Sequence, residues 1–135
     1  MQAHFQDLQA RGPARGYYLE PTKSILVVAP GNVSRAKEHF RGLGIRVVTG
    51  HWYLGSFLGD VSSEREWLGR KIKGWKESVA ILAGVALKHP HSAYTRLQKS
   101  LQQEWDFVQR VTPEVGAAFG PVEEALQDVF VPALF

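Results

Sequence analysis

The fold of this chain is decided by residues 50–59, Gly50-His51-Trp52-Tyr53-Leu54-Gly55-Ser56-Phe57-Leu58-Gly59. Aromatic and apolar residues flank Gly55, and glycine adopts backbone conformations that other residues avoid. The stretch favours a strand that turns tightly at Gly55 into a hairpin. A core strand with a glycine bulge is the alternative interpretation of the same residues.

Upstream of this stretch, the sequence indicates a strand, a helix and a second strand. Residues 24–29, Ser-Ile-Leu-Val-Val-Ala, form an unbroken β-branched run that is typical of a strand covered on both faces. A helix over residues 35–42 follows, with Ser34 as its N-cap, and residues 45–48 form the next strand. We also expect a short helix over residues 2–11 and a short strand at residues 17–19.

Downstream of this stretch, the pattern is helical throughout. A helix that begins near Ser62 is expected to continue to Leu87, and a second helix covers Ser92 to Val111. Steps of three and four place apolar residues on one stripe of each helix. The first stripe is Leu68, Ile72, Trp75, Val79, Leu82 and Ala86, and the second is Ala93, Leu97, Leu101, Trp105, Val108 and Val111. A last helix is expected over residues 121–130.

The predicted fold class is therefore α+β. A small antiparallel sheet with two helices occupies residues 1–62, and an all-helical region occupies residues 63–135. The change from mixed to purely helical patterning near residue 62 is the one candidate boundary between the two regions.

The composition limits the class of protein further. The 135 residues are 44% hydrophobic, which is ordinary for a globular domain, and they include no cysteine, so a disulfide framework and a thiolate zinc site are excluded. The net charge is +3. Lys and Arg outnumber Asp and Glu over residues 63–110, whereas residues 111–135 contain acids and no Lys or Arg. This distribution indicates either a polyanion-binding surface or a solvated helix face.

Two segments resemble a known family. Gly16 to Val28, with Lys23 before an apolar strand, and the aromatic-Leu-Gly segment at Tyr53, Leu54 and Gly55 resemble the end of the palm in a reverse transcriptase of the non-LTR retroelement type. Residues 63–135 resemble a block found beside such regions in retroelements, which includes the phrase Ser100-Leu101-Gln102-Gln103-Glu104-Trp105. The resemblance implies a palm remnant over residues 1–62 and a thumb-like helical region over residues 63–135.

The resemblance also implies roles for individual residues. Lys23 would be an auxiliary catalytic residue of the intact polymerase only, where a cation neutralises the departing pyrophosphate. The alternative is a lysine that extends to solvent from a strand end. Tyr53, Leu54 and Gly55 would form a hairpin that grips the primer end.

The predicted helices offer further contacts to nucleic acid. Arg70 and Lys73 on the first helix, and Arg96 and Lys99 on the second, would contact the template-primer backbone without sequence preference. Trp67, Trp75 and Trp105 could stack on bases, although core packing is the alternative for residues on apolar stripes.

No metal site is expected in this chain. The five histidines lack a ligand spacing, and magnesium is expected only in the intact polymerase, whose paired aspartates would lie upstream. The lack of cysteine and of a long apolar run predicts an intracellular protein in a reducing compartment, in either nucleus or cytoplasm.

These observations predict a fragment of an RNA-directed DNA polymerase of a retrotransposon, inactive by itself. Its partners would be an RNA or DNA template-primer and the missing N-terminal palm and fingers of the same polyprotein, with no membrane. The apolar end at residues 131–135 indicates truncation there also. The alternative is a small basic nucleic-acid-binding or protein-interaction domain without enzymatic activity.

Overall fold

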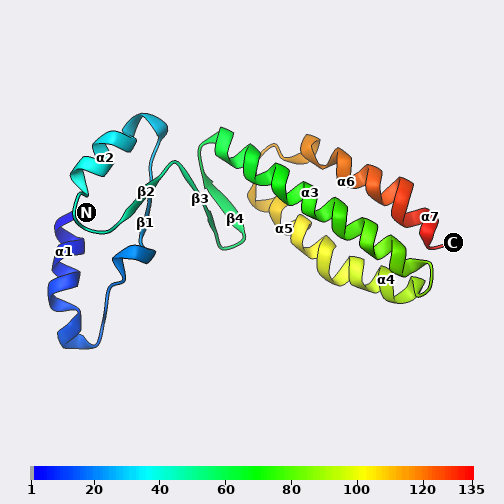
Figure 1. The fold of residues 1–135 in the computed structure, drawn as a ribbon, viewed down its shortest axis with the longest axis horizontal. Helices are drawn as coiled ribbons and strands as arrows, with labels where there is room; N and C mark the ends of the chain where they lie inside the picture. Colours follow the sequence, from blue (N-terminus) through cyan, green and yellow to red (C-terminus); the bar gives the residue numbers. More distant parts are fainter. Residues whose placement is uncertain (1) are drawn as a thin grey trace. The chain divides into compact units, whose positions relative to one another are not determined.

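A computed structural model describes residues 2–135, and its helices and short strands confirm the α+β class (Figure 1). The chain divides into two compact units, Met1–His51 and Trp52–Phe135. The boundary precedes the composition change near residue 62, because the hairpin that follows His51 packs on the helical core.

The first unit is built around a β-α-β arrangement. Helix α1 covers Gln2–Arg11, strand β1 covers Ile25–Val27, helix α2 covers Val33–His39 and strand β2 covers Arg46–Val48. β1 and β2 pair in parallel, with Leu26 opposite Val47. The antiparallel arrangement predicted for these strands is therefore wrong. Helix α2 carries the chain back to the end at which β1 begins, so β2 runs in the same direction as β1. The strand expected at residues 17–19 is irregular.

This first unit has little core. Among residues 2–51, only Gly12 and Ala36 are buried, and Ile25, Leu26 and Val47 are partly exposed. Helix α2 begins at Val33 after Asn32, one residue before the predicted cap at Ser34. The apolar strands and the helix exist as predicted, but they bury less surface than an unbroken β-branched run indicates.

The second unit begins with a hairpin and continues as helices. Strand β3 covers Gly50–Tyr53, strand β4 covers Ser56–Gly59, and the two pair with each other in a second two-stranded sheet. Helix α3 covers Val61–Ala86. Its N-cap is Asp60, whose carboxylate accepts hydrogen bonds from the backbone N–H groups of Ser62 and Ser63, both at 3.1 Å. The cap therefore precedes Ser62, near which the helix is predicted to begin.

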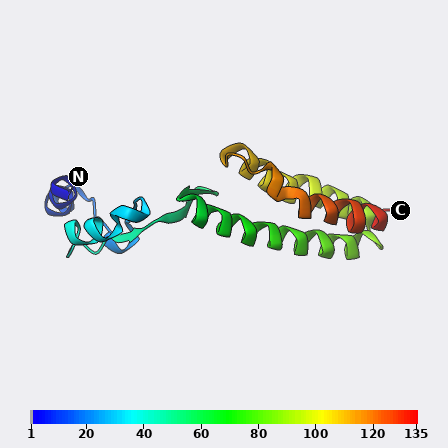
Figure 2. The ribbon, with the colours of Figure 1, turned by 90° about the horizontal axis from the view of Figure 1, so that it is seen from above.

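Two further helical runs pack on α3, as Figure 2 shows from above. The first is α4 (Pro90–Arg96), a π-helical segment (Leu97–Leu101) and α5 (Gln102–Val111). The second is α6 (Gly120–Ala125), a π-helical segment (Leu126–Phe130) and α7 (Val131–Ala133). The helix begins at Pro90, two residues before the predicted start at Ser92. Proline is well suited to the first turn of a helix, because its missing N–H would have no partner there.

One continuous core joins the three helical runs. It includes Val79, Val108, Val122 and Phe130, which are almost fully buried. The predicted stripe of α3 is confirmed, with Leu82 packed against the core's edge. At the end of the second stripe, Thr112 is buried and Val111 is exposed, which reverses the prediction for Val111.

Candidate nucleic-acid interface

The hairpin tip has an unusual backbone. Leu54 has φ 50° and Gly55 has φ 87°, so both central residues of the turn are left-handed, as a tight type I′ turn requires. Glycine adopts this conformation freely, but it is costly for a bulky residue such as leucine. Leu54 is 76% exposed and Tyr53 is 58% exposed. The turn therefore presents two large side chains to solvent.

The other side of the turn is packed against α5. A Cβ atom placed on Gly55 would lie 2.9 Å from Cε1 of Phe107, closer than real Cβ atoms approach a neighbour. Gly55 is thus needed twice, for its backbone conformation and for the space that the Phe107 ring occupies. The glycine-bulge alternative does not apply, because Gly55 lies in the turn between β3 and β4.

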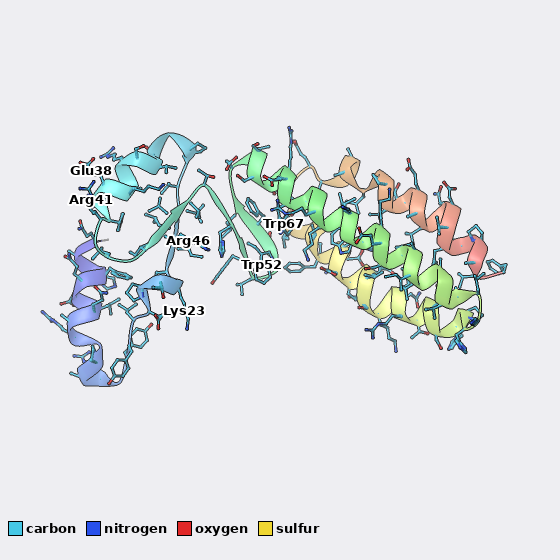
Figure 3. The ribbon with its side chains drawn as sticks, in the orientation of Figure 1. Lys23, Glu38, Arg41, Arg46, Trp52 and Trp67 are labelled. Carbon is cyan, nitrogen blue, oxygen red and sulfur yellow. The ribbon has the colours of Figure 1, made fainter. Side chains whose placement is uncertain are left out.

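A second contact fixes the hairpin to α3. The rings of Phe57 and Trp67 stack with centroids 5.8 Å apart and an interplanar angle of 29°. Figure 3 labels Trp67 on α3 beside the hairpin that carries Trp52. Trp67 is buried in this contact, so it is unavailable for stacking on a base.

The other two candidate stacking tryptophans are also core residues. Trp75 packs edge-on against Trp105, with centroids 6.4 Å apart, and against Phe119 at 5.5 Å. Trp75 and Trp105 are both buried. Core packing is therefore the correct interpretation of these tryptophans, and Trp52 and Tyr53 are the aromatic residues that the hairpin exposes.

The predicted backbone-contacting cations are all exposed and lie on helical runs that pack together. Arg70 and Lys73 are on α3, Arg96 ends α4, and Lys99 lies in the π-helical segment that follows. Arg70 is partly neutralised, because its guanidinium pairs with Glu66 one turn earlier on the same helix. Over residues 2–135, the structure gives Lys73, Arg96 and Lys99 no ion-pair partner.

A shallow groove near these residues is lined by α3 and the start of α5. Lys71 reaches from α3 to Glu104 on α5 and pairs with its carboxylate. The hydrogen bond from Lys71 lowers the pKa of Glu104 below its ordinary value, although partial burial opposes the change. The indole of Trp75 also lowers this pKa. The buried Nε1 of Trp75 nevertheless makes no hydrogen bond of good geometry in the described chain, so Lys71 is the main cause of the lowered pKa.

Lys23 belongs to the other compact unit. It is the last residue of a 3-10 turn, Pro21–Lys23, which is closed by the Ser24 N–H donating to the Pro21 carbonyl at 3.0 Å. Its side chain is exposed directly before β1 (Figure 3). All the other predicted site residues belong to the second unit.

Other classes of site find no support in the part of the chain that is described. Among residues 2–135, no three His, Cys, Asp or Glu side chains are grouped closely enough to hold a metal ion. None of the helices formed by these residues combines the length and apolar character that crossing a membrane requires.

Sequence reasoning did not identify the residues that hold the hairpin. Phe107 lies off the buried stripe of α5, and Lys71 and Glu104 stand far apart in the chain. An aromatic residue outside the apolar stripe of its helix was the available signal for Phe107.

The arrangement defines a class of site, an apolar hairpin tip fixed on a helical unit that carries exposed cations. In comparisons with known proteins, no family model, no curated protein and no solved structure matches the chain.

Proposed function

We propose that this chain is part of an RNA-directed DNA polymerase of a non-LTR retroelement, and that its second unit holds a template-primer duplex. The observation that supports this function best is the hairpin tip. Tyr53 and Leu54 are mostly exposed, while Gly55 behind them is packed on Phe107. A fixed tip with one aromatic and one apolar side chain suits contact with the sugar and base faces at a primer end.

The exposed cations supply the second part of the proposal. Arg70, Lys73, Arg96 and Lys99 lie in the same compact unit as the tip. Contacts from such residues to phosphates give affinity without sequence preference, and this affinity weakens steeply with salt. The tip would then select the primer end, and the cations would hold the duplex.

The remaining roles concern the intact polymerase. Lys23 would assist the departure of pyrophosphate there, and magnesium would be held by aspartates of the palm outside this chain. The partners would be the template-primer and the remaining palm and fingers of the same polyprotein. Such a protein would work inside the cell, in a reducing compartment.

Duplex binding tests the proposal. We expect the purified chain to bind a duplex with a recessed 3′ end weakly, and the joint variant Tyr53→Ala and Leu54→Ala to lose its preference for that end over a blunt one. Changing Arg70, Lys73, Arg96 and Lys99 to Glu together should abolish binding. Because each phosphate contact contributes about 0.9 to the salt slope of log K, neutral Gln replacements should reduce this slope by about 3 to 4.

A second charge-reversal variant with the same change in net charge distinguishes binding at the helical surface from attraction by overall charge. Arg15, Arg35, Lys37 and Arg41 are four exposed cations of the first unit. Their change to Glu should weaken binding far less. Equal losses in the two variants would show that overall charge, not the helical surface, gives the affinity.

The alternative function is a small interaction domain without enzymatic activity. Exposed apolar residues on and just after α3, such as Ile81 and Leu87, favour it. A Tyr-x-Asp-Asp box in the same reading frame upstream would support the polymerase. Several hundred upstream bases without this box would support the interaction domain.

We also expect the purified chain to add no nucleotides. Nucleotide addition uses two carboxylate-bound metal ions, and the acids of residues 1–62, Asp7, Glu20, Glu38 and Asp60, include no adjacent pair. A primer-extension assay with magnesium or manganese measures this directly. Extension by the wild-type chain, lost on metal chelation, would contradict the expectation.

A further inference from the structure

Phe107 is exposed on a face of α5 that also carries Gln103, Glu104, Arg110 and Val111. It is 42% exposed, and α5 turns Trp105 and Val108, not Phe107, into the core. A large apolar side chain outside the core gives up part of the free energy of burial. The edge of its ring lies against the hairpin turn, 2.9 Å from where a Cβ of Gly55 would stand.

The same hairpin is held a second time through α3. Phe57, two residues after Gly55, stacks on Trp67. One turn further along α3, Lys71 pairs with Glu104, which precedes Phe107 by three residues on α5. The contacts therefore form a closed ring from the hairpin to α3, from α3 to α5, and from α5 back to the turn.

Each contact in this ring restrains a different movement. The Phe57–Trp67 stack holds the hairpin against α3, and the Lys71–Glu104 pair links α3 to α5. Phe107 lies against the turn itself, at Gly55. Loss of the Phe107 ring would remove this packing from a turn whose left-handed backbone is costly at Leu54.

We propose that Phe107 is the positioning residue of the hairpin tip. It fixes the turn so that Tyr53 and Leu54 are ordered before nucleic acid arrives, and this lowers the entropy lost on binding. The inference rests on the proposed function only for what the tip contacts. The mechanical role of Phe107 is a property of the free protein.

The first measurement is the backbone order of the tip in the free chain. In Phe107→Ala, the NMR order parameters of the Leu54 and Gly55 amides should fall from about 0.85 to below about 0.6, with those of α3 unchanged. Phe107→Leu should retain most of the order. Tyr94→Ala, which removes an equally exposed aromatic residue from α4, is the matched control. An unchanged tip in a folded Phe107→Ala variant would overturn the inference.

The second measurement is a double-mutant cycle on the affinity for a duplex with a recessed 3′ end. Phe107→Ala should weaken binding about fivefold to tenfold, with the salt slope unchanged because no cation is lost. In a Tyr53→Ala and Leu54→Ala background, Phe107→Ala should cost no more affinity. An additive loss would show that Phe107 acts elsewhere and would overturn the positioning role.

The two measurements also separate this inference from the proposed function. A disordered tip with unchanged duplex affinity would support the positioning role and refute the nucleic-acid role of the tip. An ordered tip with reduced affinity would refute the positioning role and would show that Phe107 contributes to binding in another way.

Discussion

Leu54 combines an unfavourable backbone conformation with an exposed side chain. Asparagine tolerates left-handed backbone far better than leucine, and Asn-Gly is the preferred pair for this kind of turn. Leu54→Asn should therefore raise the free energy of unfolding by about 0.5–1 kcal/mol. It should also weaken binding to a recessed 3′ end, because the apolar tip is lost. Thermal melts and duplex titrations of the one variant measure both effects.

A loss of stability in Leu54→Asn would contradict the view that leucine is retained there for contact. Gly55→Ala provides the opposite control. It should destabilise the chain by about 1–3 kcal/mol, because alanine is strained at φ 87° and its Cβ would collide with Phe107.

Glu104 gives the ring of contacts a dependence on pH. Its pKa in the folded chain lies below the ordinary value of 4.5, chiefly because Lys71 donates a hydrogen bond to it. The Lys71–Glu104 pair therefore contributes its whole stabilisation when the pH is above the ordinary pKa of Glu104. This contribution is lost as the pH falls through the lower pKa that Glu104 has in the folded chain. Because the pair is partly exposed, we expect less than about 1 kcal/mol.

Thermal melts of wild type and Glu104→Gln between neutral pH and pH 3 test this dependence. The difference between them should be largest at neutral pH and should shrink below about pH 4.5 and in high salt. Glu123→Gln, at an exposed site without an ion pair in the described structure, is the control. A difference independent of pH would show that Glu104 acts through packing alone.

At the scale of elements, α3 depends on its N-cap. The Asp60 carboxylate accepts two backbone N–H bonds and a 2.7 Å bond from the Ser63 hydroxyl. Asp60→Ala should lower the free energy of unfolding by about 1 kcal/mol, because two N–H groups of the first turn lose their acceptor. Ser62→Ala, which keeps the cap, should have little effect in the same denaturant titration. Equal losses in both variants would remove the capping explanation.

The helices could be predicted because their apolar residues recur with helical spacing, but their irregularities could not. From Ala93 to Trp105 the stripe takes three steps of four residues, and each drifts by about 40° on a regular helix. The π-helical segment at Leu97–Leu101 absorbs this drift, so that Trp105 and Val108 stay in the core. At the other end, α5 stops at Val111, and Thr112 leaves the helix with an extended backbone and is buried. The antiparallel direction predicted for β1 and β2 was wrong, because strand pairing depends on contacts distant in sequence that local patterning does not reveal.

At the scale of the whole molecule, the candidate site likewise combines residues with a local sequence signal and residues whose role depends on distant contacts. The tip residues Tyr53, Leu54 and Gly55 could be found from sequence, because glycine within an aromatic strand is a local signal. Phe107 could not, because its role depends on α5 packing beside a hairpin some fifty residues earlier. The reverse-transcriptase origin remains a prediction from resemblance.

The two compact units should differ in stability. Residues 2–51 bury only Gly12 and Ala36, and β1 and β2 have three residues each, whereas the second unit contains a continuous core around Val79 and Phe130. Segments with few buried apolar contacts open at low free energy. Amides of β1, β2 and α2 should therefore exchange with solvent at least about a hundredfold faster than those of α3.

Native-state hydrogen exchange resolved by residue measures this difference. Val79→Ala, which leaves a cavity at a fully buried position, should lower protection across the second unit by about 2 kcal/mol and leave the first unit unchanged. Uniformly strong protection from Tyr18 through Leu58 in a monomer would contradict the prediction. It would mean that the first unit is stabilised as fully as the second, and the interpretation of residues 1–62 as a palm remnant would then fall.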